Sequence, residues 1–213
     1  MNIGIIGGGA IGKTYGRLWH QAGHDIFISS RHPERLAGFV EELGGSAQAG
    51  APEEAAAFGE VVLLAVNYVG IDQAIAAIRP HVADKVVIDA TNPLRLADNG
   101  SLERTIPLDA VAGVVAQEKL PEARIAKSLT SLWTGHVERR ANRDEPQVAM
   151  PLAADDPTDR QLVASLVKDA GLVPVDVGTL ASSAVLDPQS PLWNVVLTAS
   201  ELTQRLATRT RTA

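Results

Sequence analysis

Residues 1–31 read MNIGIIGGGAIGKTYGRLWHQAGHDIFISSR. An apolar run at positions 3–6 is long enough for a buried strand, and it leads into the spacing G-x-G-x-x-G formed by Gly7, Gly9 and Gly12. Apolar residues then recur at helical intervals, at positions 11, 15, 18 and 22, and a second strand pattern follows at 25–30. This order predicts a strand, a tight turn, a helix and a second strand, the start of a βαβ unit.

The three glycines predict a phosphate-binding turn. The first allows the sharp turn, the second lets the backbone approach a pyrophosphate, and the third lets helix and strand pack closely. Free N–H groups and the positive end of the helix dipole then favour an anion. A glycine-rich turn without a ligand is the alternative, but the flanking strand and helix favour a dinucleotide site.

The end of the second strand predicts which dinucleotide binds. NAD-specific folds place an Asp or Glu there, whereas this chain has Ser29, Ser30 and Arg31, followed by Arg35. A guanidinium can meet a 2′-phosphate with two charge-assisted hydrogen bonds. We therefore expect NADP rather than NAD, the alternative being that both arginines are ordinary solvated charges.

Composition excludes several classes of protein. The chain has 213 residues, of which 46% are hydrophobic and 21% charged, and its net charge is −6. These values are typical of a globular protein and argue against a nucleic-acid partner. Cysteine is absent and the five histidines show no metal-ligand spacing, so we expect no metal site. We also expect no membrane span and a cytoplasmic location.

The rest of the chain alternates strand and helix patterns. Strands are expected at 47–48, 60–66, 85–89, 124–127, 147–152 and 172–177, and helices at 33–43, 52–58, 70–79, 108–119, 157–171, 180–187 and 191–209. Irregular segments are expected at 94–107 and 130–136, and a charged surface loop at 138–146. The pattern predicts an α/β Rossmann fold, a doubly wound parallel sheet with a small C-terminal α/β extension. We expect one domain, with a dinucleotide-binding core at 1–128 and an extension at 129–213.

Polar residues follow two of the expected strands. Asn67 comes after the strand at 60–66, and Asn92 and Pro93 come after the strand at 85–89. Open α/β sheets bind ligands at the carboxyl ends of their strands, so we expect these loops to flank the nicotinamide, although both residue types also simply favour turns. In the loop at 130–136, Trp133 could stack on a flat ring and His136 could bond to one; a Trp at a core edge and a surface His fit the same pattern.

The chain resembles the F420-dependent NADP reductase family over nearly its full length. The resemblance rests on GGGAIG at 7–12, SSR at 29–31, and VAMPLAADDPTDRQLVASLVKDAGLVPVDVGTLASSAVLD at 148–187. A related NADPH-binding module occurs in membrane ferric reductases. The family implies hydride transfer between NADPH and the deazaflavin F420.

The resemblance also implies roles for particular residues. The pyrophosphate would lie against Gly8, Gly9, Ala10 and Ile11, and the 2′-phosphate against Ser30, Arg31 and Arg35. The nicotinamide side would be lined by Val66, Asn67, Asn92 and Pro93. The second substrate would lie near Leu129, Leu132, Trp133 and His136. Residues 129–133 read LTSLW, where the family carries a sequence like H-T-I-P, and residues 94–100 also differ.

Two other functions fit the same first half. One is an imine, pyrroline-carboxylate or hydroxyacid-type NADP-dependent reductase, but those enzymes usually carry a long helical domain after the Rossmann part. The other is a non-catalytic module that senses NADPH. We identify no acid or base residue, which is consistent with two cofactors that carry the chemistry. The apolar stripe at 191–209 predicts a homodimer.

Overall fold

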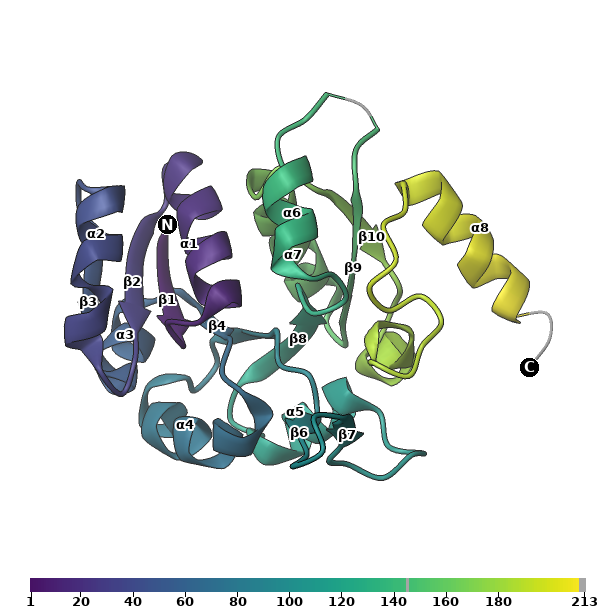
Figure 1. Ribbon diagram of the computed structural model, residues 1–213, viewed down its shortest axis with the longest axis horizontal. Coiled ribbons are helices and arrows are strands. Elements are labelled where there is room, and N and C mark those ends of the chain that lie inside the picture. Colours follow the sequence, from purple (N-terminus) through teal and green to yellow (C-terminus); the bar gives the residue numbers. More distant parts are fainter. Residues whose placement is uncertain (145, 211–213) are drawn as a thin grey trace.

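The computed structural model describes residues 1–144 and 146–210, and one eight-stranded sheet runs through this part of the chain (Figure 1). The strands lie in the order β3-β2-β1-β4-β5-β8-β9-β10. Their bounds are Asn2–Ile6 (β1), Asp25–Ser29 (β2), Gln48–Gly50 (β3), Val61–Leu64 (β4), Val86–Asp89 (β5), Arg124–Ser128 (β8), Ala149–Ala154 (β9) and Val173–Asp176 (β10). The six strands β3, β2, β1, β4, β5 and β8 are parallel to one another, whereas β9 is antiparallel to β8 and β10 is parallel to β9.

Helices cover both faces of the sheet, which confirms the predicted doubly wound α/β fold (Figure 1). One face packs on α1 (Ala10–Gln21), α2 (Ala37–Leu43), α6 (Thr134–Arg140) and α7 (Pro157–Asp169). The other packs on α3 (Pro52–Phe58), α4 (Ile71–Ile78) and α5 (Ala112–Lys119), with the short 3-10 helix η4 (Leu180–Leu186). Further 3-10 turns are η1 (Pro33–Leu36), η2 (Tyr68–Gly70) and η3 (Arg79–His81). Because strand order reverses beside β1, a crevice is expected between β1 and β4 at their carboxyl ends.

Residues 94–107 are not irregular as predicted, because they contain a β-hairpin. Strands β6 (Leu94–Leu96) and β7 (Leu102–Arg104) pair antiparallel as a separate two-stranded sheet. The side chain of Asn99 accepts hydrogen bonds from the N–H of Ser101 at 2.9 Å and from its hydroxyl at 2.7 Å. This Asx turn closes the hairpin, and strands of three residues are too short to show a period in the sequence.

The charged stretch that was expected to be a surface loop begins as helix α6. Val137 is fully buried, and the Thr14 hydroxyl of α1 donates a 2.7 Å hydrogen bond to the Glu138 carboxylate. The buried residues Thr134 and Val137, together with the hydrogen bond to α1, stabilise a helix whose other side chains are mostly charged. The part of the prediction that falls on residue 145 lies outside the described residues.

The C-terminal helix α8 (Ala199–Thr210) is shorter than predicted, because it begins at a capping box rather than at position 191. The N–H of Thr198 donates to the Glu201 carboxylate at 2.8 Å, and the N–H of Glu201 donates to the Thr198 hydroxyl at 3.3 Å. Leu197 and Leu202 pack with Ala149 of β9 in a small core of their own. Figure 1 shows α8 at the β10 end of the molecule. None of the described helices is long and apolar enough to cross a membrane.

Candidate functional site

The glycine turn between β1 and α1 has the geometry of a dinucleotide-binding turn. Gly7 has φ +119°, and a Cβ there would lie 2.4 Å from the carbonyl oxygen of Ala65. A Cβ on Gly12 would lie 2.0 Å from the carbonyl oxygen of Gly7. At Gly9, in contrast, a Cβ would meet no atom within 4 Å. Gly7 and Gly12 are therefore required by the fold itself, whereas Gly9 faces open space where a ligand could approach.

The first turn of α1 leaves several donors free. Gly9 is the N-cap and no side chain caps the helix, so the first backbone hydrogen bond runs from the N–H of Lys13 to the carbonyl of Gly9. Among the described residues, the N–H groups of Ala10, Ile11 and Gly12 have no acceptor. Ala10 is exposed, so these donors and the helix dipole present a site that fits a pyrophosphate.

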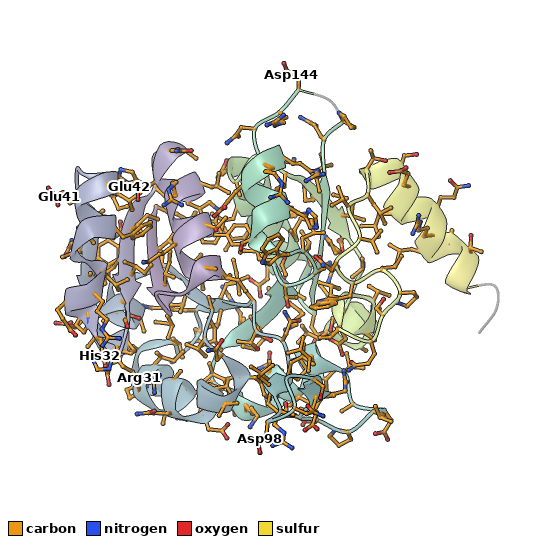
Figure 2. The ribbon with its side chains drawn as sticks, viewed as in Figure 1. Arg31, His32, Glu41, Glu42, Asp98 and Asp144 are labelled. Atoms are coloured by element: carbon orange, nitrogen blue, oxygen red, sulfur yellow. The ribbon has the colours of Figure 1, made fainter. Side chains whose placement is uncertain are left out.

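The end of β2 places two cations at the surface. The Ser30 hydroxyl accepts a 3.1 Å hydrogen bond from the N–H of His32, which fixes the turn. Ser29 is buried, and its hydroxyl donates a hydrogen bond to the Ile5 carbonyl. Figure 2 labels Arg31 and His32 beyond the end of β2. Arg31 and Arg35 are both exposed, and neither guanidinium group has a hydrogen-bond or ion-pair partner among the described residues. They are free to meet a phosphate.

The loops after β4 and β5 lie at the same edge of the sheet as the glycine turn. A Cβ on Gly7 would meet Cγ1 of Val66 at 3.3 Å, so Val66 lies directly against this turn. Asn67 is exposed, and its backbone carbonyl accepts the N–H of Gly70. The turn-forming role considered for Asn67 is therefore real, and its side chain is still available to a ligand.

Asn92 links the β5 loop to the loop after β8. Its Oδ1 accepts a 2.7 Å hydrogen bond from the Thr130 hydroxyl, and its Nδ2 donates to the Thr130 carbonyl at 3.3 Å. Pro93 is buried, and its carbonyl accepts the N–H of Thr105 in the hairpin. The structure thus joins the expected nicotinamide side to the expected acceptor segment at 129–133.

A buried ion pair that the sequence analysis missed lies beneath these loops. Lys127 of β8 donates from Nζ to Oδ2 of Asp89 on β5 at 2.8 Å, and also to the Thr91 carbonyl at 2.5 Å. The other carboxylate oxygen accepts the N–H and the hydroxyl of Thr91 at 2.9 and 2.7 Å. Asp89 and Lys127 are register partners in neighbouring strands. The pair therefore fixes the exit of the chain from β5.

The acceptor segment presents one large side chain to solvent. Leu129 and Leu132 are buried in the core, and Leu129 has φ +62°, which is unusual for a non-glycine residue. Trp133 is 61% exposed, and its ring meets that of His136 edge-on with centroids 5.9 Å apart. Trp133 is thus a surface aromatic residue rather than part of a core edge. Of the four residues expected near a second substrate, Trp133 and His136 are the accessible ones.

The C-terminal segment holds this loop in place, which the sequence did not indicate. Asn194 accepts the N–H of Trp133 through Oδ1 at 2.9 Å, and its own N–H donates to the Ser131 carbonyl at 2.7 Å. The indole of Trp193 donates to the Thr130 carbonyl at 3.3 Å. Residues 193 and 194 therefore position both ends of the segment that carries Trp133.

Two ionisable groups near the site have altered pKa values. Burial, followed by the nearby charge of Asp89, raises the pKa of Tyr68 to about 12. Burial also raises the pKa of Asp187, which lies 3.4 Å from Arg104, although the N–H of Ala112 and nearby cations oppose the shift. Among the described residues, no group of three His, Cys, Asp or Glu side chains is placed to hold a metal ion.

Comparison with known proteins identifies the family. The sequence profile of the family described as "NADP oxidoreductase coenzyme F420-dependent" matches residues 2–93. The F420-dependent NADP reductase of Methanothermobacter thermautotrophicus is 30% identical over 205 residues, which cover 90% of this chain and 87% of that protein. The chain belongs to the F420-dependent NADP reductase family. As a member of that family it is an NADP-dependent oxidoreductase.

Solved structures agree with this assignment to the F420-dependent NADP reductase family at the level of the fold. The hypothetical protein SMa0349 from Sinorhizobium meliloti is 26% identical with a TM-score of 0.79, and the match covers 93% of this chain and 95% of that one. A protein from Arthrobacter sp. FB24, proposed to be an F420-dependent NADP reductase, is 20% identical with a TM-score of 0.77 and coverages of 98% and 92%. A pyrroline-5-carboxylate reductase from Coxiella burnetii is matched over only 58% of its length.

Proposed function

We propose that the protein transfers a hydride between NADPH and coenzyme F420. When bound, NADPH supplies the hydride from C4 of its nicotinamide, and F420 accepts it at C5 of the deazaflavin together with a proton from water. The single observation that supports this most strongly is the 30% identity over 90% of the chain to an F420-dependent NADP reductase. The cofactor residues and the acceptor residues named above are proposals on the same basis.

This chain's residues would bind and align the two molecules rather than take part in bond making. The free N–H groups of α1 would hold the pyrophosphate, and Arg31, with Ser30 and Arg35, would hold the 2′-phosphate. Val66, Asn67, Asn92 and Pro93 would line the nicotinamide. Alignment of two reactants at contact distance can by itself supply a large part of a rate enhancement.

The buried network around Thr91 would keep the nicotinamide side rigid. Three residues form hydrogen bonds with the segment that follows β5. Asp89 and Lys127 bond to Thr91, and Thr130 bonds to Asn92, so this segment would be fixed in position. Trp133 would offer a flat surface to the acceptor ring. These contacts would bring the acceptor and nicotinamide sides together.

An imine-, pyrroline-carboxylate- or hydroxyacid-type NADP-dependent reductase is the main alternative to the proposed function. The Coxiella burnetii pyrroline-5-carboxylate reductase is matched over 83% of this chain but only 58% of its own length, whereas the F420-dependent NADP reductase is matched over 87% of its length. A non-catalytic NADPH sensor is the other competitor, and only turnover separates it from the proposed enzyme.

A panel of acceptors tests the proposal. Protein and NADPH are mixed in turn with F420, a flavin, a ferric chelate and cyclic imines, and loss of nicotinamide absorbance is followed. We expect turnover with F420 and little with the others. Turnover with imines but not with F420 would overturn the proposal, and binding of NADPH without any turnover would favour the sensor.

The assembly, location and domain division also remain proposals. We propose a homodimer formed through the C-terminal region, a cytoplasmic enzyme, and a division at residues 128 and 129 between the dinucleotide-binding core and the extension. Light scattering tests the first of these: a mass of 22.4 kDa, that of one chain, would contradict it.

A further inference from the structure

Three arginines gather at the end of α6 and in the loop that follows. Arg139, Arg140 and Arg143 line, together with Pro146, a surface hollow of about 330 Å³. The whole chain carries a net charge of −6, so the positive charge of these three arginines is opposite in sign to the charge of the whole chain. The proposed cofactor site lies at the glycine turn and uses none of these residues.

The described part of the chain does not neutralise this cluster. None of the three arginines forms an ion pair with a described carboxylate. Glu138, on the same helix, accepts the Thr14 hydroxyl and so faces α1. Figure 2 shows Asp144 at the tip of the loop, pointing away from α6. No carboxylate within residues 1–144 and 146–210 pairs with these guanidinium groups, which match phosphate and carboxylate groups in shape as well as charge.

Arg139 links the hollow to the exposed aromatic residue of the acceptor segment. The guanidinium of Arg139 lies over the Trp133 ring, 5.7 Å from its centroid. Nη2 of Arg139 and Nη1 of Arg140 each lie 3.4 Å from Nδ1 of His136. From Trp133 to Arg140 the helix rises roughly 10 Å, at about 1.5 Å per residue.

We infer that this arginine hollow binds the anionic end of the acceptor, a chain bearing phosphate or carboxylate groups roughly 10 Å from a flat ring. The inference rests on the proposed function, because F420 is a deazaflavin with such a chain, a phosphodiester followed by glutamate residues. The ring lies at Trp133 and the chain follows α6 to Arg140 and Arg143. Affinity for the acceptor then depends on its tail as well as on its ring.

A double variant separates the tail from the ring. Arg140→Ala/Arg143→Ala removes two cations and leaves Arg139 on Trp133, and Lys168→Ala/Arg205→Ala removes the same charge from exposed positions on α7 and α8. Each protein is titrated, by fluorescence and without NADPH, with F420 and with its riboflavin-like fragment, which lacks the phosphate and the glutamates. The kcat and KM for both ligands, and the Kd of NADPH, are then measured.

We expect the Kd and KM for F420 to rise about tenfold in the arginine variant, since two exposed charge pairs contribute up to about 1 kcal/mol each. The kcat, the affinity for the fragment and the Kd of NADPH should stay unchanged, and the control variant should resemble the wild type. The difference should shrink in high salt.

Other outcomes would overturn the inference. An unchanged affinity for F420, an equal loss for F420 and the fragment, or a loss of NADPH binding would each show that the hollow does not hold the acceptor's tail. If the wild type reduced neither ligand, the proposed function would fail instead, and the fluorescence titration would still decide whether the arginines bind the tail.

Discussion

Nζ of Lys127 lies 2.8 Å from Oδ2 of Asp89, and both side chains are only 1% exposed. The two residues are neighbours on β8 and β5. Both form hydrogen bonds with Thr91, which lies just after β5 and just before Asn92. A buried cation and a buried anion of this kind depend on each other, because either charge alone would be buried without its counter-charge.

Lys127→Met should therefore be strongly destabilising, because it leaves the Asp89 carboxylate buried without its counter-charge. We expect a loss of about 3–5 kcal/mol in the free energy of unfolding, measured by urea titration. Asp89→Asn/Lys127→Met removes both charges and keeps an oxygen for the N–H of Thr91, so it should be more stable than Lys127→Met alone. A double variant that is less stable than the single one would contradict this account of the pair.

Gly9→Ala and Gly12→Ala should separate a ligand requirement from a folding requirement. A Cβ on Gly12 would lie 2.0 Å from the Gly7 carbonyl oxygen, so Gly12→Ala should cost about 1–3 kcal/mol of stability. A Cβ on Gly9 meets open space, so Gly9→Ala should cost less than about 1 kcal/mol. Gly9→Ala should nevertheless weaken NADPH binding about tenfold or more, because the methyl group blocks close approach of the pyrophosphate. Thermal unfolding and isothermal titration measure the two effects, and normal NADPH affinity in Gly9→Ala would place the pyrophosphate elsewhere.

Arg31→Ala should reduce the affinity for NADPH about tenfold, since a hydrogen-bonded charge pair contributes about 1.5 kcal/mol. The affinity for NADH should hardly change, because NADH lacks the 2′-phosphate. Arg35→Ala provides a second probe one helical turn away, with a smaller expected loss. Equal losses of NADPH and NADH affinity in Arg31→Ala would show that this residue does not contact the phosphate.

Tyr68 should remain a neutral phenol throughout the range of ordinary assays. Burial raises its pKa to about 12, so deprotonation falls above the pH at which an exposed tyrosine would ionise. Tyr68→Phe should therefore leave the shape of the kcat/KM profile unchanged between about pH 6 and pH 10. A break near pH 10 that disappears in Tyr68→Phe would mean that the phenol titrates there and takes part in the reaction.

The sequence indicates the parts of the candidate site that depend on short, contiguous patterns. The glycine turn, the Ser30-Arg31 pair at the end of β2 and the loops after β4 and β5 all follow from local spacing and from the rule that parallel strands end at one edge. Helix α6 was missed because its charged surface resembles a loop and only its contact with α1 reveals it.

The contacts that no local pattern encodes were also missed. Asp89 and Lys127 are 38 positions apart, and only the register of β5 with β8 makes them neighbours. Asn194, far along the chain, holds the backbone of Trp133. Such pairings come from tertiary packing, which a single sequence does not display. The arginine hollow is likewise visible only once α6 and the following loop are placed.

The most direct test of the central claim is isotope transfer. NADPH deuterated on each face of the nicotinamide C4 is incubated in turn with the protein and F420, and the reduced deazaflavin is examined by mass spectrometry and NMR. We predict that deuterium from one face only appears at C5 of the deazaflavin, without exchange with water. Reduced deazaflavin without deuterium from either NADPH, or no reduction at all, would contradict direct hydride transfer between the two cofactors.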